Sequence, residues 1–120
     1  PFYHTANRQI PWLREIHPEP TVEMHPKTGE ELGIKDGDWV WIETPYMEGR
    51  VKEKAVLTPR VHPQVISAEP FWWFPEREGP EYGCFESNVN VVASYDLPRD
   101  PVVGSTQIRG SLCKIYKVES

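Results

Sequence analysis

A run of hydrogen-bond donors near the start of the chain is the first feature that could do chemistry. Its planar or charged side chains are those of His4, Asn7, Arg8 and Gln9. The apolar segment 10–13 follows directly and would anchor the run against a core. A donor-rich loop held by an apolar plug suits a ligand with phosphates or a heterocycle, because such ligands offer anionic oxygens and planar polar edges. We therefore predict a binding loop over residues 4–9.

A second polar cluster lies at residues 87–90, where serine and asparagine alternate with an apolar residue. Asparagine amides both donate and accept hydrogen bonds, so they can bind the edge of a heterocycle. Asparagine also commonly caps turns in loops. The pattern alone leaves both interpretations of Asn88 and Asn90 open.

The chain shows no pattern typical of a metal site or of a nucleophilic centre. Its histidines and cysteines are His4, His17, His25, His62, Cys84 and Cys113. Zinc ligands of these types are usually spaced CxxC or HxxxH, and neither spacing occurs. We expect no metal ligand and no catalytic residue in this chain, and we expect both cysteines to be free thiols.

Length and charge exclude several classes of protein. The chain has 120 residues, enough for one domain, with 18 acidic and 13 basic residues and a net charge of −5. This charge repels phosphate backbones, so we expect no nucleic-acid partner. No apolar run approaches the roughly 20 residues that a membrane-spanning helix needs, so we also expect no direct membrane insertion.

Short strands are expected to position the two polar clusters, because β-branched residues are frequent and 13 prolines interrupt the chain. Residue type and alternation predict strands at residues 21–25, 38–44, 50–58, 65–69 and 111–118. Val22 and Met24 should face the core. Pro26 and Gly33 bracket the one short helix. These elements favour a small β-barrel of six or nearly six strands.

Two aromatic groups are expected to pack. Trp39 and Trp41 flank Val40 in a strand, so both indoles share one face, and core or interface packing is favoured over ligand stacking. The segment 71–101 is rich in proline and aromatic residues. We expect it to be an ordered excursion that packs through residues 71–74 onto the barrel or onto a neighbouring part of a larger protein, because burying four aromatic side chains offsets much of the ordering entropy.

Several motifs, in their order along the chain, resemble those of a known family. The matching stretches are Asn7 to Glu15, Pro18-Glu19-Pro20, His25-Pro26, Glu31-Leu32-Gly33-Ile34 and Asp36-Gly37-Asp38-Trp39-Val40. Together with Asn90 and the closing strand, they resemble the C-terminal molybdopterin-dinucleotide-binding domain of the dimethyl sulfoxide reductase family. In detail the chain is similar to the branch that contains formate dehydrogenase, thiosulfate reductase and acetylene hydratase.

The resemblance implies a mainly β fold, a double-psi β-barrel (aspartate decarboxylase-like) with one short helix. Such a barrel covers one side of a bis(molybdopterin guanine dinucleotide) cofactor that holds molybdenum or tungsten. The first loop would contact the cofactor, Asn90 matches the Asn of the family's Asn-x-Leu-Thr motif, and Arg109 falls where a polar or basic residue meets the pterin. The expected cofactor-binding residues are His4, Asn7, Arg8, Gln9, Asn88, Asn90 and Arg109. We expect five of them to converge on one rim of the barrel, namely His4, Asn7, Arg8, Asn90 and Arg109.

The chain departs from the family pattern at two places. The usual first strand, which ends in Thr-Gly-Arg, is absent, and Asn90 is followed by Val91-Val92-Ala93 without the expected threonine. We therefore expect residues 1–120 to be a molybdopterin-dinucleotide-binding domain that is an N-terminally truncated fragment of a larger enzyme, with one strand edge left exposed or filled by another chain.

The implied function is that of the cofactor-binding C-terminal domain of a molybdenum or tungsten oxidoreductase, which orients and encloses the pterin dinucleotide. The isolated fragment would be inactive. Upstream domains of the same polypeptide would carry the metal ligand and any iron–sulfur cluster, and electron-transfer subunits would be further partners. The alternative is a free-standing double-psi barrel that acts as an interaction module without cofactor. The full reading frame distinguishes the two, and the compartment, cytoplasm or periplasm, stays open.

Overall fold

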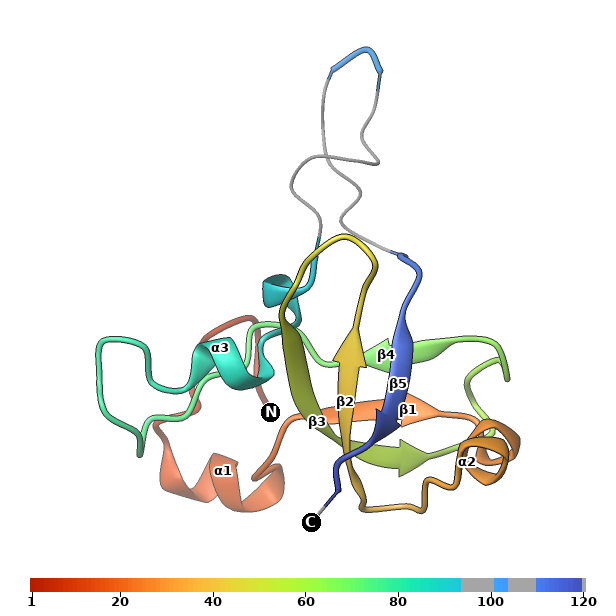
Figure 1. Ribbon diagram of the computed structural model, residues 1–120. Helices are drawn as coiled ribbons and strands as arrows, with labels where there is room; N and C mark the ends of the chain where they lie inside the picture. The colour runs from red at the N-terminus through yellow and green to blue at the C-terminus, as the bar shows by residue number, and fades with distance from the viewer. Residues whose placement is uncertain (94–100, 104–109, 120) are drawn as a thin grey trace.

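The computed structural model describes residues 1–93, 101–103 and 110–119, and its centre is one curled β-sheet surrounded by short helices (Figure 1). The strands are β1 (Thr21–Met24), β2 (Trp39–Glu43), β3 (Arg50–Leu57), β4 (Ile66–Ala68) and β5 (Lys114–Lys117). The helices are α1 (Pro11–Ile16), α2 (Pro26–Leu32), α3 (Cys84–Ser87) and the 3-10 helix η1 (Val89–Val91). The prediction of a mainly β fold is confirmed.

The five strands form one sheet in the order β4-β1-β3-β2-β5. β1 runs parallel to β3, and the other neighbouring pairs are antiparallel. β3 pairs with β2 through its first half and with β1 through its second half, so the sheet curls into part of a barrel (Figure 1). The strands predicted over 38–44 and 50–58 are present as the antiparallel hairpin of β2 and β3, and the strand predicted over 111–118 is present as β5. β4 and β5 form the two edges of the sheet within the described ranges.

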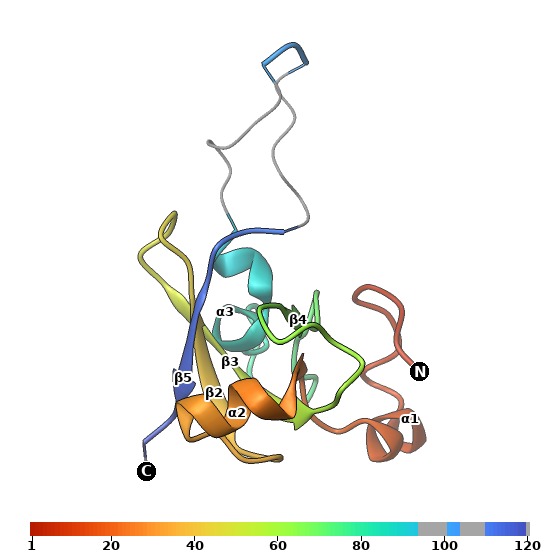
Figure 2. The same ribbon diagram turned by 90° about the vertical axis from the view of Figure 1, so that its right-hand side faces the viewer.

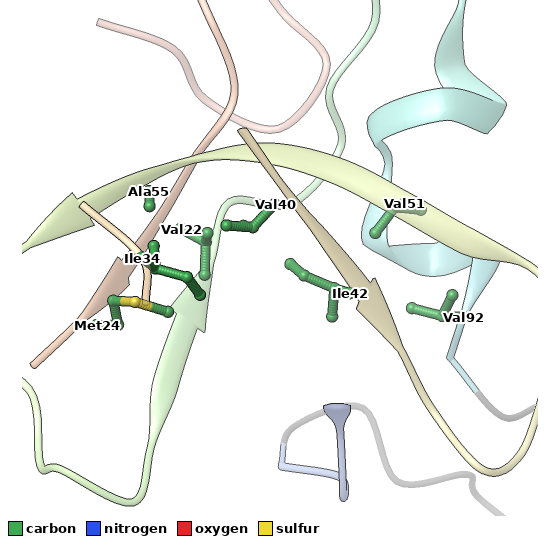
Figure 3. Packing of buried hydrophobic residues seen from close by; sticks show 8 residues of the cluster. All are labelled: Val22, Met24, Ile34, Val40, Ile42, Val51, Ala55 and Val92. Atoms are coloured by element: carbon green, nitrogen blue, oxygen red, sulfur yellow. The ribbon is translucent and has the colours of Figure 1, made fainter. Parts of the chain in front are cut away.

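Inward-facing apolar side chains fill the concave side of the sheet (Figure 3). The buried cluster consists of Val22, Met24, Ile34, Val40, Ile42, Val51, Ala55 and Val92. β1 and β2 bury every second residue, because successive side chains of a strand point to opposite faces. The prediction that Val22 and Met24 face the core is confirmed, since both are 0% exposed.

The helix α2 is the one predicted from the sequence, with the same bounds. Pro26 occupies its first turn, where the missing N–H costs nothing, and the Nδ1 of His25 accepts a hydrogen bond from the backbone N–H of Lys27 at 3.1 Å. Gly33 ends the helix in a left-handed conformation with φ 71°. Ile34, the residue after Gly33, is buried in the core.

The prediction of a single short helix is wrong in number, because α1, α3 and η1 also form. Residues 10–13 were predicted to anchor the first loop as an apolar plug, whereas α1, which begins at Pro11, has no buried residue and leaves Trp12 68% exposed. The guanidinium of Arg14 fixes this helix by donating to the carbonyl oxygen of Pro18 at 2.9 Å and to the carboxylate of Glu76 at 2.9 and 3.1 Å. Each extra helix spans fewer than seven residues, so the periodicity of a helix was too brief to recognise.

Trp39 and Trp41 lie outside the core, contrary to one of the two packing modes expected for them. Both are half-buried on the outer face of the sheet, because the alternation of β2 gives the inner face to Val40. The guanidinium carbon of Arg50 lies 3.9 Å from the centre of the Trp41 ring, and the Nζ of Lys52 lies 5.4 Å from that of Trp39. Cations of the neighbouring strand therefore cover the indoles.

The aromatic residues 71–74 pack against the domain, as predicted. Trp72 and Phe74 are 0% and 6% exposed, and Phe71 and Trp73 are half-buried. Residues 94–100 of the same excursion lie outside the described residues.

Cys84 and Cys113 are both free, as expected. Within the described ranges, no helix is long and apolar enough to cross a membrane.

Candidate functional site

The first loop, residues 3–9, contains the binding loop predicted over residues 4–9 and turns back on itself before α1. His4 and Asn7 adopt left-handed φ values of 52° and 76°. For residues other than glycine such conformations cost about 1–3 kcal/mol each, and they persist where the surrounding structure holds them, often at ligand sites. His4 and Gln9 are exposed and Asn7 is half-buried. The loop therefore offers an imidazole and two amides at or near the surface.

Arg8, at the base of the first loop, points into the molecule and is 1% exposed. Its guanidinium lies over the rings of Phe2 and Trp72, 5.1 and 4.6 Å from their centres. It donates hydrogen bonds to the carbonyl oxygen of His4 and, at 3.4 Å, to that of Pro70. Burial lowers the pKa of Arg8, yet a guanidinium remains charged in proteins. Arg8 thus holds the first loop from the inside.

Asn88 and Asn90 lie at η1 and differ in their surroundings. The side-chain oxygen of Asn88 accepts a hydrogen bond from the backbone N–H of Asn90 at 3.1 Å, so Asn88 caps η1. Asn90 is exposed. The hydroxyl of Thr44, just after β2, donates to the carbonyl oxygen of Val92 at 2.5 Å and fixes η1 beside the β2–β3 hairpin.

The two polar clusters occupy separate parts of the described structure. The first loop lies beside α1, whereas η1 contacts β3, and Figure 2 shows the two stretches apart from each other. Arg109 falls outside the described residues. The convergence of all five residues on one rim therefore stays a prediction.

A group of ionisable residues near Arg8 was not predicted from the sequence. Glu53, on the inward face of β3, is 0% exposed, and burial raises its pKa to about 9. Its Oε1 accepts a hydrogen bond from the backbone N–H of Glu69 at 3.1 Å. The Oε2 of Glu69 accepts from the backbone N–H of Thr21 at 3.1 Å and lies 2.7 Å from the Nε2 of His17. Strand alternation could have revealed Glu53, because it falls on the same face as two core residues of β3.

A surface pocket of about 450 Å³ lies where β2 ends and β5 begins. Its lining residues are Glu43, Thr44, Pro45, Met47, Leu112, Cys113 and Lys114. None of them was predicted as a site residue, and nothing in the sequence pattern brings these two stretches together.

Within the described ranges, no three side chains of His, Cys, Asp or Glu gather in a way that could hold a metal ion.

Most of the chain matches one known protein family. The family described as "Molydopterin dinucleotide binding domain" matches residues 2–111. The chain belongs to this molybdopterin dinucleotide-binding domain family. The resemblance found in the sequence is thereby confirmed. The domain is thus a cofactor-binding module for the molybdopterin dinucleotide.

Three relatives show how much of each protein the domain matches. The chain is 42% identical to dopamine dehydroxylase of Eggerthella lenta, and the match covers 97% of this chain and 11% of the relative. It is 38% identical to a sulfite dehydrogenase of Allochromatium vinosum, where the match covers 98% of this chain and 14% of the relative. The structure of acetylene hydratase from Pelobacter acetylenicus matches with a TM-score of 0.88 at 32% identity, over 97% of this chain and 16% of that chain. The chain thus spans a small part of each relative.

Proposed function

We propose that this domain is the C-terminal, cofactor-binding domain of a molybdenum or tungsten oxidoreductase and that residues 1–120 are a fragment of that larger enzyme. Its ligand is a molybdopterin guanine dinucleotide, and its barrel is of the double-psi type. The observation that carries the proposal is the match to the family over residues 2–111, together with a curled sheet that resembles acetylene hydratase at a TM-score of 0.88.

The names of the relatives support a role in holding the cofactor rather than in selecting the substrate. One is a dehydroxylase, one a dehydrogenase and one a hydratase, and each contains a stretch similar to nearly all of this chain. A part shared by enzymes with such different reactions most simply serves what they have in common, which is the pterin dinucleotide. Substrate selection would then fall to other parts of the enzyme.

The donor set of the described residues fits such a group. A pterin ring presents N–H and carbonyl edges, and amides and imidazoles can both donate to and accept from those edges. The exposed side chains of His4, Gln9 and Asn90 and the half-buried side chain of Asn7 have this chemistry. We assign to the site the residues His4, Asn7, Arg8, Gln9, Asn88, Asn90 and Arg109, with Arg8 on its inner side.

When bound, the cofactor supplies the metal at which redox chemistry takes place, and the domain supplies no catalytic residue or metal ligand of its own. The chain's own residues bind the pterin dinucleotide, orient it and exclude water from it. The rest of the polypeptide would hold the metal ligand and any iron–sulfur cluster. Electron-transfer subunits would be further partners.

The experiment that tests this proposal measures cofactor content in the complete enzyme. We expect His4→Ala and Asn90→Ala to lose molybdopterin faster than the wild type, about fivefold for each hydrogen bond of ordinary strength that is removed. Glu78→Ala is the matched control, because Glu78 is exposed and outside both polar clusters. Equal retention in all three variants would contradict the assignment of these residues.

A further inference from the structure

The aromatic segment, residues 71–73, contacts the first loop through successive side chains. The ring of Phe71 lies 4.9 Å from the imidazole of His4. Two residues later, the indole Nε1 of Trp73 donates a hydrogen bond to the carbonyl oxygen of Thr5 at 2.7 Å. Nearly seventy residues separate the partners in the sequence, so these contacts fix the loop to the body of the domain rather than to its own neighbours.

The middle residue of the aromatic segment, Trp72, holds Arg8. Trp72 is 0% exposed, and its ring lies 4.6 Å from the guanidinium carbon. The same guanidinium donates to the carbonyl oxygen of His4 within the first loop and to that of Pro70 beside the aromatic segment. One planar group thus joins the two stretches, which the five fixed donors of arginine allow and the single ammonium of lysine does not.

We propose that the aromatic segment and Arg8 form a clamp that positions the first loop for the pterin dinucleotide. In this clamp Arg8 is a positioning residue rather than a direct contact of the cofactor. The inference rests on the proposed function, and it deepens that function by naming what holds the binding loop in place. It also gives the aromatic segment a role that neither the core nor the sheet explains.

The conformation of the first loop shows why a clamp is needed. His4 and Asn7 are held at positive φ, which a short free segment of non-glycine residues would not keep. Ordering several residues only on binding would consume much of the binding free energy, at about 1–2 kcal/mol for each backbone residue fixed. A loop held in advance presents the imidazole of His4 without that cost. Because Arg8 is 1% exposed, it contributes through the loop's shape and not through its own charge at the surface.

Two variants of the complete enzyme test the clamp from its two sides. Arg8→Lys keeps the positive charge but removes the planar fork, and Trp73→Phe removes the donor to Thr5 without changing any charge. The reporter is the backbone N–H of Ala6, which donates to the carbonyl oxygen of Tyr3 at 3.0 Å inside the loop. In enzyme prepared without cofactor, hydrogen exchange at Ala6 should become about tenfold faster in both variants, since a tether of the loop is lost. In the loaded enzyme, both variants should lose molybdopterin faster than the wild type.

Matched controls separate the clamp from a general loss of stability. Arg60→Lys and Trp39→Phe make the same substitutions outside the clamp, at an exposed position after β3 and at a half-buried position on the outer face of β2, and both should leave exchange at Ala6 and cofactor retention unchanged. Unchanged exchange at Ala6 in Arg8→Lys and in Trp73→Phe would overturn the clamp. Faster exchange at Ala6 with full cofactor retention would overturn the role of the clamp in cofactor binding. Cofactor loss in Arg8→Lys but not in Trp73→Phe would overturn that role as well. A wild-type enzyme without molybdopterin would instead overturn the proposed function, whatever the exchange shows.

Discussion

Two acidic residues meet on the concave side of the sheet, where the backbone N–H of Glu69 donates a hydrogen bond to the Oε1 of Glu53 at 3.1 Å. The Oε2 of Glu53 has no hydrogen-bond partner within the described part of the chain. Burial raises the pKa of Glu53 to about 9, and repulsion by the Glu69 carboxylate adds to this effect. A neutral carboxyl group is therefore built into the domain at neutral pH.

This buried carboxyl group should make the domain less stable as pH rises. An unfolded Glu53 ionises near 4.5 and the folded one near 9, so the folded state holds one more proton between these values. Its contribution to stability is complete below the lower pKa and is lost as pH rises through the higher one, at about 1.4 kcal/mol per pH unit in between. Glu53→Gln cannot ionise, so the free energy of unfolding of this variant should rise relative to that of the wild type as the pH increases from 5 to 9.

Denaturant unfolding at several pH values measures this difference between Glu53→Gln and the wild type. Glu78→Gln is the control, because it changes an exposed acid in the same way. A constant difference between Glu53→Gln and the wild type over pH 5–9 would show that Glu53 is ionised in the folded domain.

The two methionines should respond very differently to truncation. Met24 is 0% exposed in the core, whereas Met47 lies in the β2–β3 hairpin and is 36% exposed. Met24→Ala should lower the free energy of unfolding by about 2–5 kcal/mol, since it leaves a cavity. Met47→Ala should change it by less than about 0.5 kcal/mol. Similar shifts in the melting temperature of the two variants would contradict the core described in Figure 3.

Gly29 should resist replacement even though it lies in a helix. A Cβ at this position would lie 2.8 Å from the carbonyl oxygen of Ile34 and 2.9 Å from a methyl carbon of Leu57. The gain in helix propensity from glycine to alanine is about 1 kcal/mol, and the clash of an overpacked site costs about 1–3 kcal/mol. Because the carbonyl belongs to the backbone, Gly29→Ala should lower the melting temperature.

The exposed Glu30, one residue further along α2, provides the comparison for Gly29. Glu30→Ala should leave the melting temperature nearly unchanged, because it adds no atom to the interior. Scanning calorimetry of both variants gives the result, and a Gly29→Ala variant as stable as the wild type would show that α2 packs less closely than described.

Local signals in the sequence were sufficient for most of the sheet and for α2. The alternation of Val22 and Met24 identified the buried face of β1, and Pro26 and Gly33 marked both ends of the helix, because each acts through its own backbone geometry. The same local logic failed in β2. Trp39 and Val40 are both apolar, so alternation could not tell which face is the core, and the cations that cover the indoles come from another strand.

The candidate site was harder to predict because its geometry depends on distant contacts. The residue types of the first loop indicated a binding role, but the inward direction of Arg8 depends on Trp72, more than sixty residues away. Glu53 lies on the same face of β3 as Val51 and Ala55, so alternation could have placed it inward, but a carboxyl group at that position gave no apolar signal for burial. Local pattern predicts which residues could bind a ligand, whereas tertiary packing decides which of them face it.

The most direct test of the central claim is to identify what the purified complete enzyme releases on acid denaturation. The enzyme would be produced in a host that synthesises molybdopterin cofactors, and the released pterin and nucleotide would be quantified for each polypeptide by fluorescence and mass spectrometry. We predict a molybdopterin-derived pterin together with GMP, the nucleotide of the guanine dinucleotide form. Protein that folds, yet releases neither pterin nor nucleotide, would contradict the account.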